Sequence, residues 1–444
     1  MKIKNKFIRG IGVYFIVLGI MWLGLIITTL IPNHCIQKNM IQSALIIGKS
    51  QPFATCDGDK MNGIADNYAD SIWLNVAWYM GKGNPFVSSV NTQYYDGEEQ
   101  GQNIGLYQAV TDENTVANVD YTRYWHGTAG IIRILHLFTD VNGIRYLGFI
   151  VTLGLATILM MLLMKRGKDF QAIAFFLSLC AVKIWNIRLS MEYQPAFIIG
   201  FFICILYVLF EKKGNDVLLL LALISGQLIA FFDFLTTETV TILLPLILVV
   251  GLRATENRLG KRKANCRFLL AQGMAWFVAY GATIIFKWFL ASIILSENKL
   301  LTAMESVQER VNGTVGFQGN GTSIAQIFAA PAANLTVLFG GEKRMEFMPL
   351  LSGIVFIVVY IMIFIIGSKK VAGEKKLAMG MLFGLGGLVI LRYMVLSNHS
   401  YLHAFFTYRG LVSMLMAMMT MIVLNIKNIT NITRQQGAEF YEKE

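Results

Sequence analysis

Ten apolar segments, separated by charged or polar stretches, restrict this sequence to a helical, membrane-spanning fold. Each segment is roughly 15 to 27 residues long, and a bilayer is crossed by a helix of about 20 apolar residues. We therefore predict an all-α integral membrane protein with about ten transmembrane helices. The predicted spans are residues 8–31, 144–164, 170–187, 195–210, 216–234, 238–252, 268–294, 348–367, 377–396 and 409–426.

The composition agrees with a membrane protein and makes a nucleic-acid partner unnecessary. Of the 444 residues, 55% are hydrophobic and only 15% are charged, and a soluble chain of this length could not bury so much apolar surface. The net charge of +11 comes from basic residues clustered between apolar segments, as in cytoplasmic loops. The first apolar segment is too long for a signal peptide and lacks a clear cleavage site, so we interpret it as an uncleaved span.

The basic clusters also predict the orientation of the chain. They fall on the same side of the predicted spans as the basic N-terminus, and basic loops mark the cytoplasmic side. We therefore expect a multi-pass protein of the cell membrane, with residues 1–444 as a single multispan domain and both termini cytoplasmic. Two long extracytoplasmic loops remain, at residues 32–143 and 295–347. Cys35 and Cys56 lie in the first loop, where the compartment permits a disulfide without requiring one.

Residues 57–82 of the first loop carry two acids at the start of an amphipathic helix. Helical spacing places Asp66 and Asp70 side by side, with an apolar stripe on a neighbouring face. We expect this helix to lie on the membrane with its acids held at the surface. Like charges at this spacing oppose a helix by roughly 0.2 to 0.5 kcal/mol, which favours a chemical role. The alternative is structural: Asp66 caps the helix and Asp70 favours its positive end.

The segment YTRYWHG, residues 121–127, combines groups that suit a phosphorylated sugar. Arg123 and His126 can neutralise a phosphate, and the ring of Trp125 can pack against the C–H face of a sugar. An interfacial Trp/Tyr anchor preceding a span is the alternative role for the same residues.

A second polar cluster, FFDFLTTETVT, forms a very short outer turn between two predicted spans. Asp233 and Glu238 flank this turn, where acids can line a substrate pocket, bind a cation or relay protons. Capping of the turn by Asp233 is a purely structural alternative.

A third cluster, SNHSYLHAFFTYR, precedes the last span. His399 and His403 are spaced as a metal-binding pair would be on a helix, but no glutamate lies between them and no third ligand is near, so we predict no metal. We instead expect both histidines, with Tyr408 and Arg409, to bind sugar hydroxyls or a phosphate. An aromatic belt with a snorkelling arginine is the alternative.

The order of these features resembles the GT-C superfamily of membrane glycosyltransferases. A first span is followed by a long extracytoplasmic loop with interfacial helices and an early acid, and then by many further spans. The segments DNYADSIWLNVAWY, YTRYWHG, FFDFLTTETVT and NHSYLHAFFTYR are also similar to segments of Gram-positive bacterial multispan proteins associated with surface polysaccharide.

This resemblance implies an inverting transfer of a sugar from a polyprenyl-phosphate donor to a cell-surface glycan acceptor, as part of cell-wall polysaccharide biosynthesis. Asp70 or Asp66 would be the general base, and Arg123, Arg409 and His126 or His403 would hold the departing phosphate. The resemblance implies membrane lipid as a further partner. It implies no metal and no cofactor, because a monophosphate leaving group does not require one.

Two other classes of protein fit parts of the sequence. A polysaccharide polymerase or ligase shares the many spans, although we expect its largest outer loop late in the chain. A transporter or flippase of lipid-linked sugars should show broken spans at matching positions of two halves, and the seven prolines show no such symmetry. The absence of GxGxxG and P-loop patterns argues against a nucleotide-driven pump.

Overall fold

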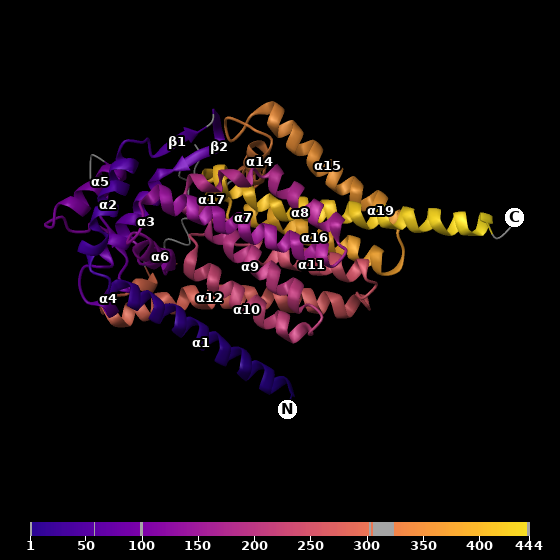
Figure 1. Ribbon diagram of the computed structural model, residues 1–444, viewed down its shortest axis with the longest axis horizontal. Helices are drawn as coiled ribbons and strands as arrows, with labels where there is room; N and C mark the ends of the chain where they lie inside the picture. The colour runs from indigo at the N-terminus through magenta and orange to yellow at the C-terminus, as the bar shows by residue number, and fades with distance from the viewer. Residues whose placement is uncertain (1, 57, 98–100, 302, 305–323, 442–444) are drawn as a thin grey trace.

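The computed structural model describes residues 2–56, 58–97, 101–301, 303–304 and 324–441. Long helices run roughly parallel to one another and form a bundle, and a lobe of shorter elements, residues 33–140, covers one end of it (Figure 1). Both chain termini lie away from the lobe (Figure 1). The described part of the chain is therefore mostly helical, with two small antiparallel pairs of strands.

Eight of the predicted spans are confirmed as helices that are long and apolar enough to cross a membrane. Their apolar windows include short turns that precede two of the helices, at Met191 and at Ala404. The eight helices are α1 (Lys2–Thr29), α7 (Val141–Lys165), α9 (Pro195–Phe210), α10 (Asn215–Phe232), α12 (Arg262–Leu295), α15 (Phe347–Lys370), α16 (Gly373–Val395) and α19 (Val412–Tyr441).

The other two predicted spans form apolar helices that are shorter than these eight spans. The segment 170–187 forms α8 (Asp169–Ala181), which ends where Lys183 adopts a left-handed conformation with φ 50°. Two short 3-10 turns follow, η2 (Ile184–Leu189) and η3 (Met191–Tyr193). The segment 238–252 forms α11 (Val240–Thr255), which is surrounded by other helices and buried along almost its whole length.

The predicted second loop also contains a helix that the sequence reading missed. α14 (Ile324–Leu338) is apolar and packs against α15 and α16 and against the short helix α17 (Ser397–Leu402). Its alanines allow this close packing, and Ala330 and Ala333 are fully buried. Two short turns, α18 (Ala404–Thr407) and η4 (Tyr408–Leu411), then lead into α19.

The lobe is built from helices around a hydrophobic core of its own. Trp73, Leu74 and Val76 lie at the centre of this core. The elements of the lobe are α2 (Asn33–Gly48), β1 (Phe53–Cys56), β2 (Asp59–Asp66), α3 (Asn67–Tyr79), α4 (Pro85–Ser88), β3 (Gln93–Tyr94), α5 (Gln102–Thr111), β4 (Val119–Asp120) and α6 (Gly127–Leu135).

The predicted position of α3 on the membrane surface is wrong. α2, α5 and α6 pack against it, and every residue from Ser71 to Met80 is buried. Asp66 and Asp70 are only 3% and 0% exposed. The apolar stripe that we assigned to lipid contacts the lobe's core instead, because an amphipathic face packs equally well against protein.

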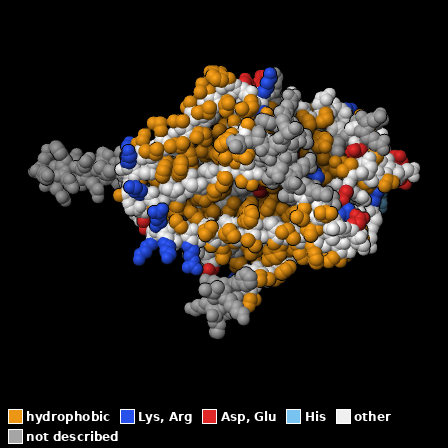
Figure 2. Space-filling view, turned by 180° about the vertical axis from the view of Figure 1, so that it is seen from behind, with side chains coloured by type: hydrophobic (Ala, Val, Ile, Leu, Met, Phe, Trp, Pro, Cys, Tyr) orange, Lys and Arg blue, Asp and Glu red, His pale blue; other side chains and the backbone are white. Residues whose placement is uncertain are grey.

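The surface separates by chemistry along the length of the bundle. In the face seen in Figure 2, hydrophobic side chains cover the middle, whereas Lys and Arg gather at the end opposite the lobe. A broad apolar band between polar ends is what contact with a bilayer requires. Cys35 and Cys56 are both free thiols in the structure.

Arg133 fastens the lobe to the first span. Its guanidinium is 0% exposed and donates to the carbonyls of Thr28, Ile31 and Ala77 and to the side-chain oxygen of Asn33. Burial lowers the pKa of Arg133 to about 10, so it stays charged at neutral pH. One side chain of α6 thus joins the end of α1, the start of α2 and the end of α3.

We expect Arg133→Ala to lower the free energy of unfolding by about 3 kcal/mol or more, because it leaves several buried acceptors unpaired. Thermal unfolding of the detergent-solubilised protein measures this change, with exposed Lys38 replaced by alanine as the control. Equal unfolding midpoints for the two variants would contradict the assigned role.

Candidate functional site

The acids Asp66 and Asp70 mark the place where the lobe meets the bundle. Asp66 ends β2 and caps α3, because its side chain accepts a hydrogen bond of 2.9 Å from the backbone N–H of Ala69. Asp70 lies one turn later on α3. The capping role proposed for Asp66 is therefore confirmed, but the two carboxyl groups face different partners.

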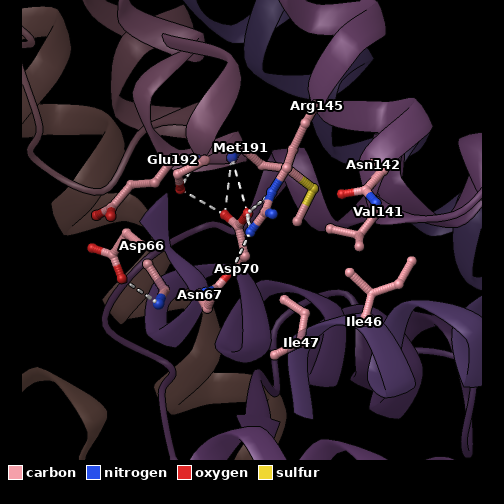
Figure 3. A network of polar contacts seen from close by, with 12 residues as sticks. Ile46, Ile47, Asp66, Asn67, Asp70, Val141, Asn142, Arg145, Met191 and Glu192 are labelled. Carbon is pink, nitrogen blue, oxygen red and sulfur yellow. Dashed lines mark hydrogen bonds and ion pairs between the residues drawn. The ribbon is translucent and has the colours of Figure 1, made fainter. Parts of the chain in front are cut away.

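Asp70 accepts hydrogen bonds from three residues, Arg145, Ser190 and Met191. Arg145 of α7 forms an ion pair with Asp70 Oδ2 at 2.6 Å. Ser190 Oγ donates to Asp70 Oδ1 at 2.7 Å, and the backbone N–H of Met191 donates to the same oxygen at 2.9 Å (Figure 3). Burial raises the pKa of Asp70, and Arg145 opposes this effect. These contacts leave Asp70 suited to holding the lobe on the bundle rather than to taking a proton.

Asp66 faces another acid. The carboxyl group of Asp66 lies beside that of Glu192, a residue of η3, at one side of Asp70 in Figure 3, and both residues are buried. Two buried carboxyl groups that lie together cannot both be ionised without a large electrostatic cost, so one of them holds a proton. Burial, and to a smaller extent the charge of Asp70, raise the pKa of Asp66 to about 7. The pair can therefore exchange a proton near neutral pH.

The 3-10 turn that carries Glu192 is fixed by its own backbone. Ser190 is extended, and its hydroxyl accepts the N–H of Glu192 at 3.1 Å while donating to Asp70. Next in the chain, Tyr193 donates to the carbonyl of Ile64 on β2 at 3.0 Å. Three consecutive residues of η3 thus contact the segment from β2 to α3, which sets the position of Glu192 against Asp66.

Asp233 and Glu238 lie in the turn between α10 and α11 and have different surroundings. Asp233 accepts the backbone N–H of Thr236 at 2.8 Å, which confirms the predicted capping of the turn, and burial raises its pKa to about 7. Glu238 forms a buried two-bond ion pair with Arg392 of α16, at 2.9 Å for each bond. Arg392 also donates to the carbonyl of Leu235. Glu238 therefore secures the turn, whereas the charge of Asp233 also acts on Glu192.

Arg123 and His126 lie on the other flank of the turn, around the ring of Phe234. Phe234 is stacked on Tyr124 with ring centres 5.0 Å apart and contacts His126 at 4.8 Å. The guanidinium of Arg123 lies 4.3 Å from the ring centre of Tyr121, and its Nε has no hydrogen-bond partner among the described residues. Arg123 is thus a cation held over two aromatic rings with its Nε unpaired.

The other two residues of this segment have structural contacts. Burial lowers the pKa of His126 to about 3, so its imidazole is neutral at pH 7 and cannot hold a phosphate by charge. Trp125 is 1% exposed, packs on Phe231 and donates to the carbonyl of Thr283 at 2.8 Å. Trp125 is therefore an anchor within the protein, where it cannot pack on a sugar.

Backbone strain accompanies this flank. His126 and Leu235 both have positive φ, 58° and 70°, a conformation that is costly for side chains with a Cβ and rare for leucine. Both residues adjoin the aromatic contact between Phe234 and His126. Strain of this kind is concentrated at functional sites, where packing imposes an exact placement.

The four candidates of the last cluster are divided between two environments. His399 and His403 lie close together, with ring centres 4.7 Å apart. Tyr408 and Arg409 are 0% and 1% exposed, so they do not form an interfacial belt. Tyr408 donates to the carbonyl of Val182 at 3.0 Å.

Arg409 joins the last span to the lobe. It lies 4.5 Å from the ring centre of Tyr193 and donates to the carbonyl of Asn62 at 3.2 Å. Its Nε, and both polar atoms of the Asn62 side chain, are buried without a hydrogen-bond partner in the described part of the chain. Buried polar atoms left in this state are rare and need an explanation, and here they lie beside the acids.

The described residues contain no cluster typical of a metal site. Among the described residues, no group of three or more His, Cys, Asp or Glu side chains is arranged to hold one. Within the described ranges, the histidine pair at 399 and 403 gains no third ligand of these types.

Several charged residues of the site were missed by the sequence reading. Arg145, Lys287 and Arg392 are each buried within a helix long enough to span the membrane, and Glu192 precedes another. All fall in or beside a predicted apolar segment, where a charge is costly and usually functional. A charge in or beside an apolar segment could have marked these residues, but the residues that they contact lie far away in the sequence.

An apolar groove runs along the bundle from this site. Its volume is about 370 Å³, and it lies between α6, α7 and α9. Its lining is apolar apart from Thr128 and Gln194, and Met191, whose N–H donates to Asp70, is one of the lining residues. Ile131, Leu147 and Val151 on its walls are partly exposed. The groove therefore has a lining suited to a hydrocarbon chain.

Comparison of the chain with known protein families, curated proteins and solved structures finds no match.

We expect Asp70→Asn to lower the free energy of unfolding by about 3 to 5 kcal/mol, because Arg145 then remains buried without a counter-charge. Asp112→Asn, at an exposed position, is the matched control in the same thermal unfolding measurement. A variant of normal stability that has lost all function would instead give Asp70 a chemical role.

Proposed function

We propose that this protein is an inverting glycosyltransferase that moves a sugar from a polyprenyl-phosphate donor to a glycan acceptor on the outer face of the cell membrane. The observation that carries the proposal is the placement of the buried carboxyl groups of Asp66 and Glu192 side by side (Figure 3), where burial raises the pKa of Asp66 to about 7. A carboxyl group of this kind can remove a proton from a hydroxyl at neutral pH.

The distribution of charge supports the orientation that this function needs. Basic side chains gather at the end of the bundle opposite the lobe (Figure 2), which is typical of the cytoplasmic side. The lobe and its acids are then extracytoplasmic, and both termini are cytoplasmic. A donor carried by lipid in the outer leaflet would meet the acids where the lobe joins the spans.

The proposed reaction assigns one role to each of the groups that have suitable surroundings. The acceptor hydroxyl oxygen attacks the anomeric carbon of the donor while Asp66 takes the hydroxyl proton. The bond between the anomeric carbon and the phosphate oxygen breaks, and its electron pair leaves with the lipid phosphate. The configuration at the anomeric carbon is inverted. Attack by the acceptor hydroxyl and departure of the lipid phosphate therefore depend on different groups, and only the attack needs a carboxylate.

Arg123 is the best candidate to hold the departing phosphate. Its guanidinium lies over the rings of Tyr121 and Tyr124, whereas the Nη atoms of Arg409 donate to the carbonyls of Phe405 and Asn62. A fixed cation that faces developing negative charge stabilises the transition state. Arg409 would act indirectly, because its hydrogen bond to the carbonyl of Asn62 holds β2 in position.

The apolar groove supports a lipid-linked donor. Its walls suit an isoprenoid chain, and they include Met191, whose N–H donates to Asp70. A lipid chain could enter the groove sideways from the bilayer, which would account for its partly exposed walls. A donor that is soluble in water would have no use for it.

We expect Asp66→Asn to remove one sugar from the surface glycan, as deletion of the protein does, because an amide cannot accept the hydroxyl proton. Glycan composition is measured by mass spectrometry in cells that carry each variant at equal membrane levels, with Asp112→Asn as the control. An intact glycan in cells carrying Asp66→Asn would overturn the proposal and favour a transporter or an accessory protein.

The same pair predicts how the reaction depends on pH. The base must be ionised, so the rate should fall as the pH drops below about 7, where Asp66 becomes protonated. A protonated Glu192 can donate a hydrogen bond to ionised Asp66 and stabilise it, while the charges of Asp70 and Arg145 act on Asp66 in opposite directions. Loss of the hydrogen bond should therefore raise the pKa of Asp66.

We expect Glu192→Ala to move the acidic limb of the pH–rate profile to higher pH, whereas Glu192→Gln, which still donates, should leave it nearly in place. Transfer of radiolabelled sugar from endogenous lipid in isolated membranes provides the rate, between about pH 5 and 9. Identical profiles for all three proteins would show that Glu192 does not act on the base.

A further inference from the structure

Two exposed aromatic rings lie on the elements that adjoin Asp66, namely β1 and the start of α3. Phe53 of β1 is paired in register with Asp66 of β2, and Tyr68 follows Asp66 by two residues. The rings of Phe53 and Tyr68 are stacked, with centres 5.7 Å apart and planes inclined by 29°. We call this pair the aromatic ledge.

The ledge is firmly supported but open to solvent. Phe405 of α18 packs edge-on against Phe53 at 5.8 Å, and the backbone N–H of Tyr68 donates to the carbonyl of Pro52 at 3.1 Å. Even so, Phe53 is 48% exposed and Tyr68 is 38% exposed. An exposed, rigid pair of rings offers a large contact area at little cost in conformational entropy.

Charged groups act on the ledge. Burial raises the pKa of Tyr68, and the charges of Asp66, Arg123 and Asp96 also act on its hydroxyl. Because β1 pairs Phe53 with Asp66, the ledge lies beside the proposed base. A lipid chain placed here would desolvate those charged groups without pairing them, so hydrocarbon is a poor occupant.

We propose that the aromatic ledge, Phe53 and Tyr68, binds the acceptor and that the acceptor is a saccharide. A sugar ring has an apolar C–H face for the ledge and hydroxyls for the carboxylates and the guanidinium. One of those hydroxyls would then lie towards Asp66. This inference rests on the proposed glycosyl transfer, and it names the residues that choose the second substrate.

The test measures saccharide binding without turnover. The full chain carrying Asp66→Asn is placed in lipid nanodiscs, and saturation-transfer NMR follows trisaccharides of glucose, galactose, rhamnose and N-acetylglucosamine. At least one should bind, and Phe53→Ala or Tyr68→Ala should weaken that binding about tenfold. Tyr68→Phe, which keeps the ring, and Phe138→Ala, at a side chain that is 79% exposed in the same lobe, should not.

Unchanged binding after loss of either ring would overturn the inference, and so would a failure of every trisaccharide to bind the Asp66→Asn protein. Thermal unfolding confirms that each variant is folded. The outcome for the transfer reaction is separate, because it depends on the glycan of cells carrying Asp66→Asn. Binding at the ledge with an intact cellular glycan would refute the transfer, and a lost sugar with binding unaffected by the ring substitutions would refute the ledge alone.

Discussion

The ion pair of Asp70 and Arg145 is the contact on which the arrangement of the site depends. Both charges are almost completely removed from water, at 0% and 10% side-chain exposure, and a buried charge is tolerated only when it is paired and hydrogen-bonded. The pair joins α3 of the lobe to α7 of the bundle, and the donors from Ser190 and Met191 bring in the turn before α9. Glu192 is the next residue, so this contact also places the second acid of the pair.

Two acids one helical turn apart therefore have different chemistry. Asp70 is surrounded by donors and a cation, whereas Asp66 meets a backbone N–H and another carboxyl group. Surroundings of these two kinds separate the proton affinities of identical groups, which is how one fold supplies both a fixed charge and a proton acceptor. The repulsion expected between the two acids on an isolated helix is small beside these effects, since each acid has its own partners from distant parts of the chain.

The sequence was sufficient for most of the membrane-spanning helices, because apolar length is a local property. It was insufficient for α14, which lies in a predicted loop, and it could not show that α11 is surrounded by other helices. The same limit applied to the site. Asp66, Asp70 and Asp233 could be selected as acids in the right region, but the pairing of Asp66 with Glu192, and of Glu238 with Arg392, links residues more than 100 positions apart. Periodicity also could not show whether the apolar face of α3 met lipid or protein.

The attachment of the first span through Arg133 has a consequence for the biogenesis of this protein. Only 11% of the apolar window of α1 is buried inside the structure, so this helix has few contacts with the bundle, and its firmest link is to a side chain made 105 residues after Thr28. At ribosomal rates of about 5 to 20 residues per second, that interval lasts roughly 5 to 20 seconds. During this time the helix must remain in the bilayer by its own hydrophobicity. A long, uniformly apolar first span meets that kinetic requirement before any tertiary contact exists.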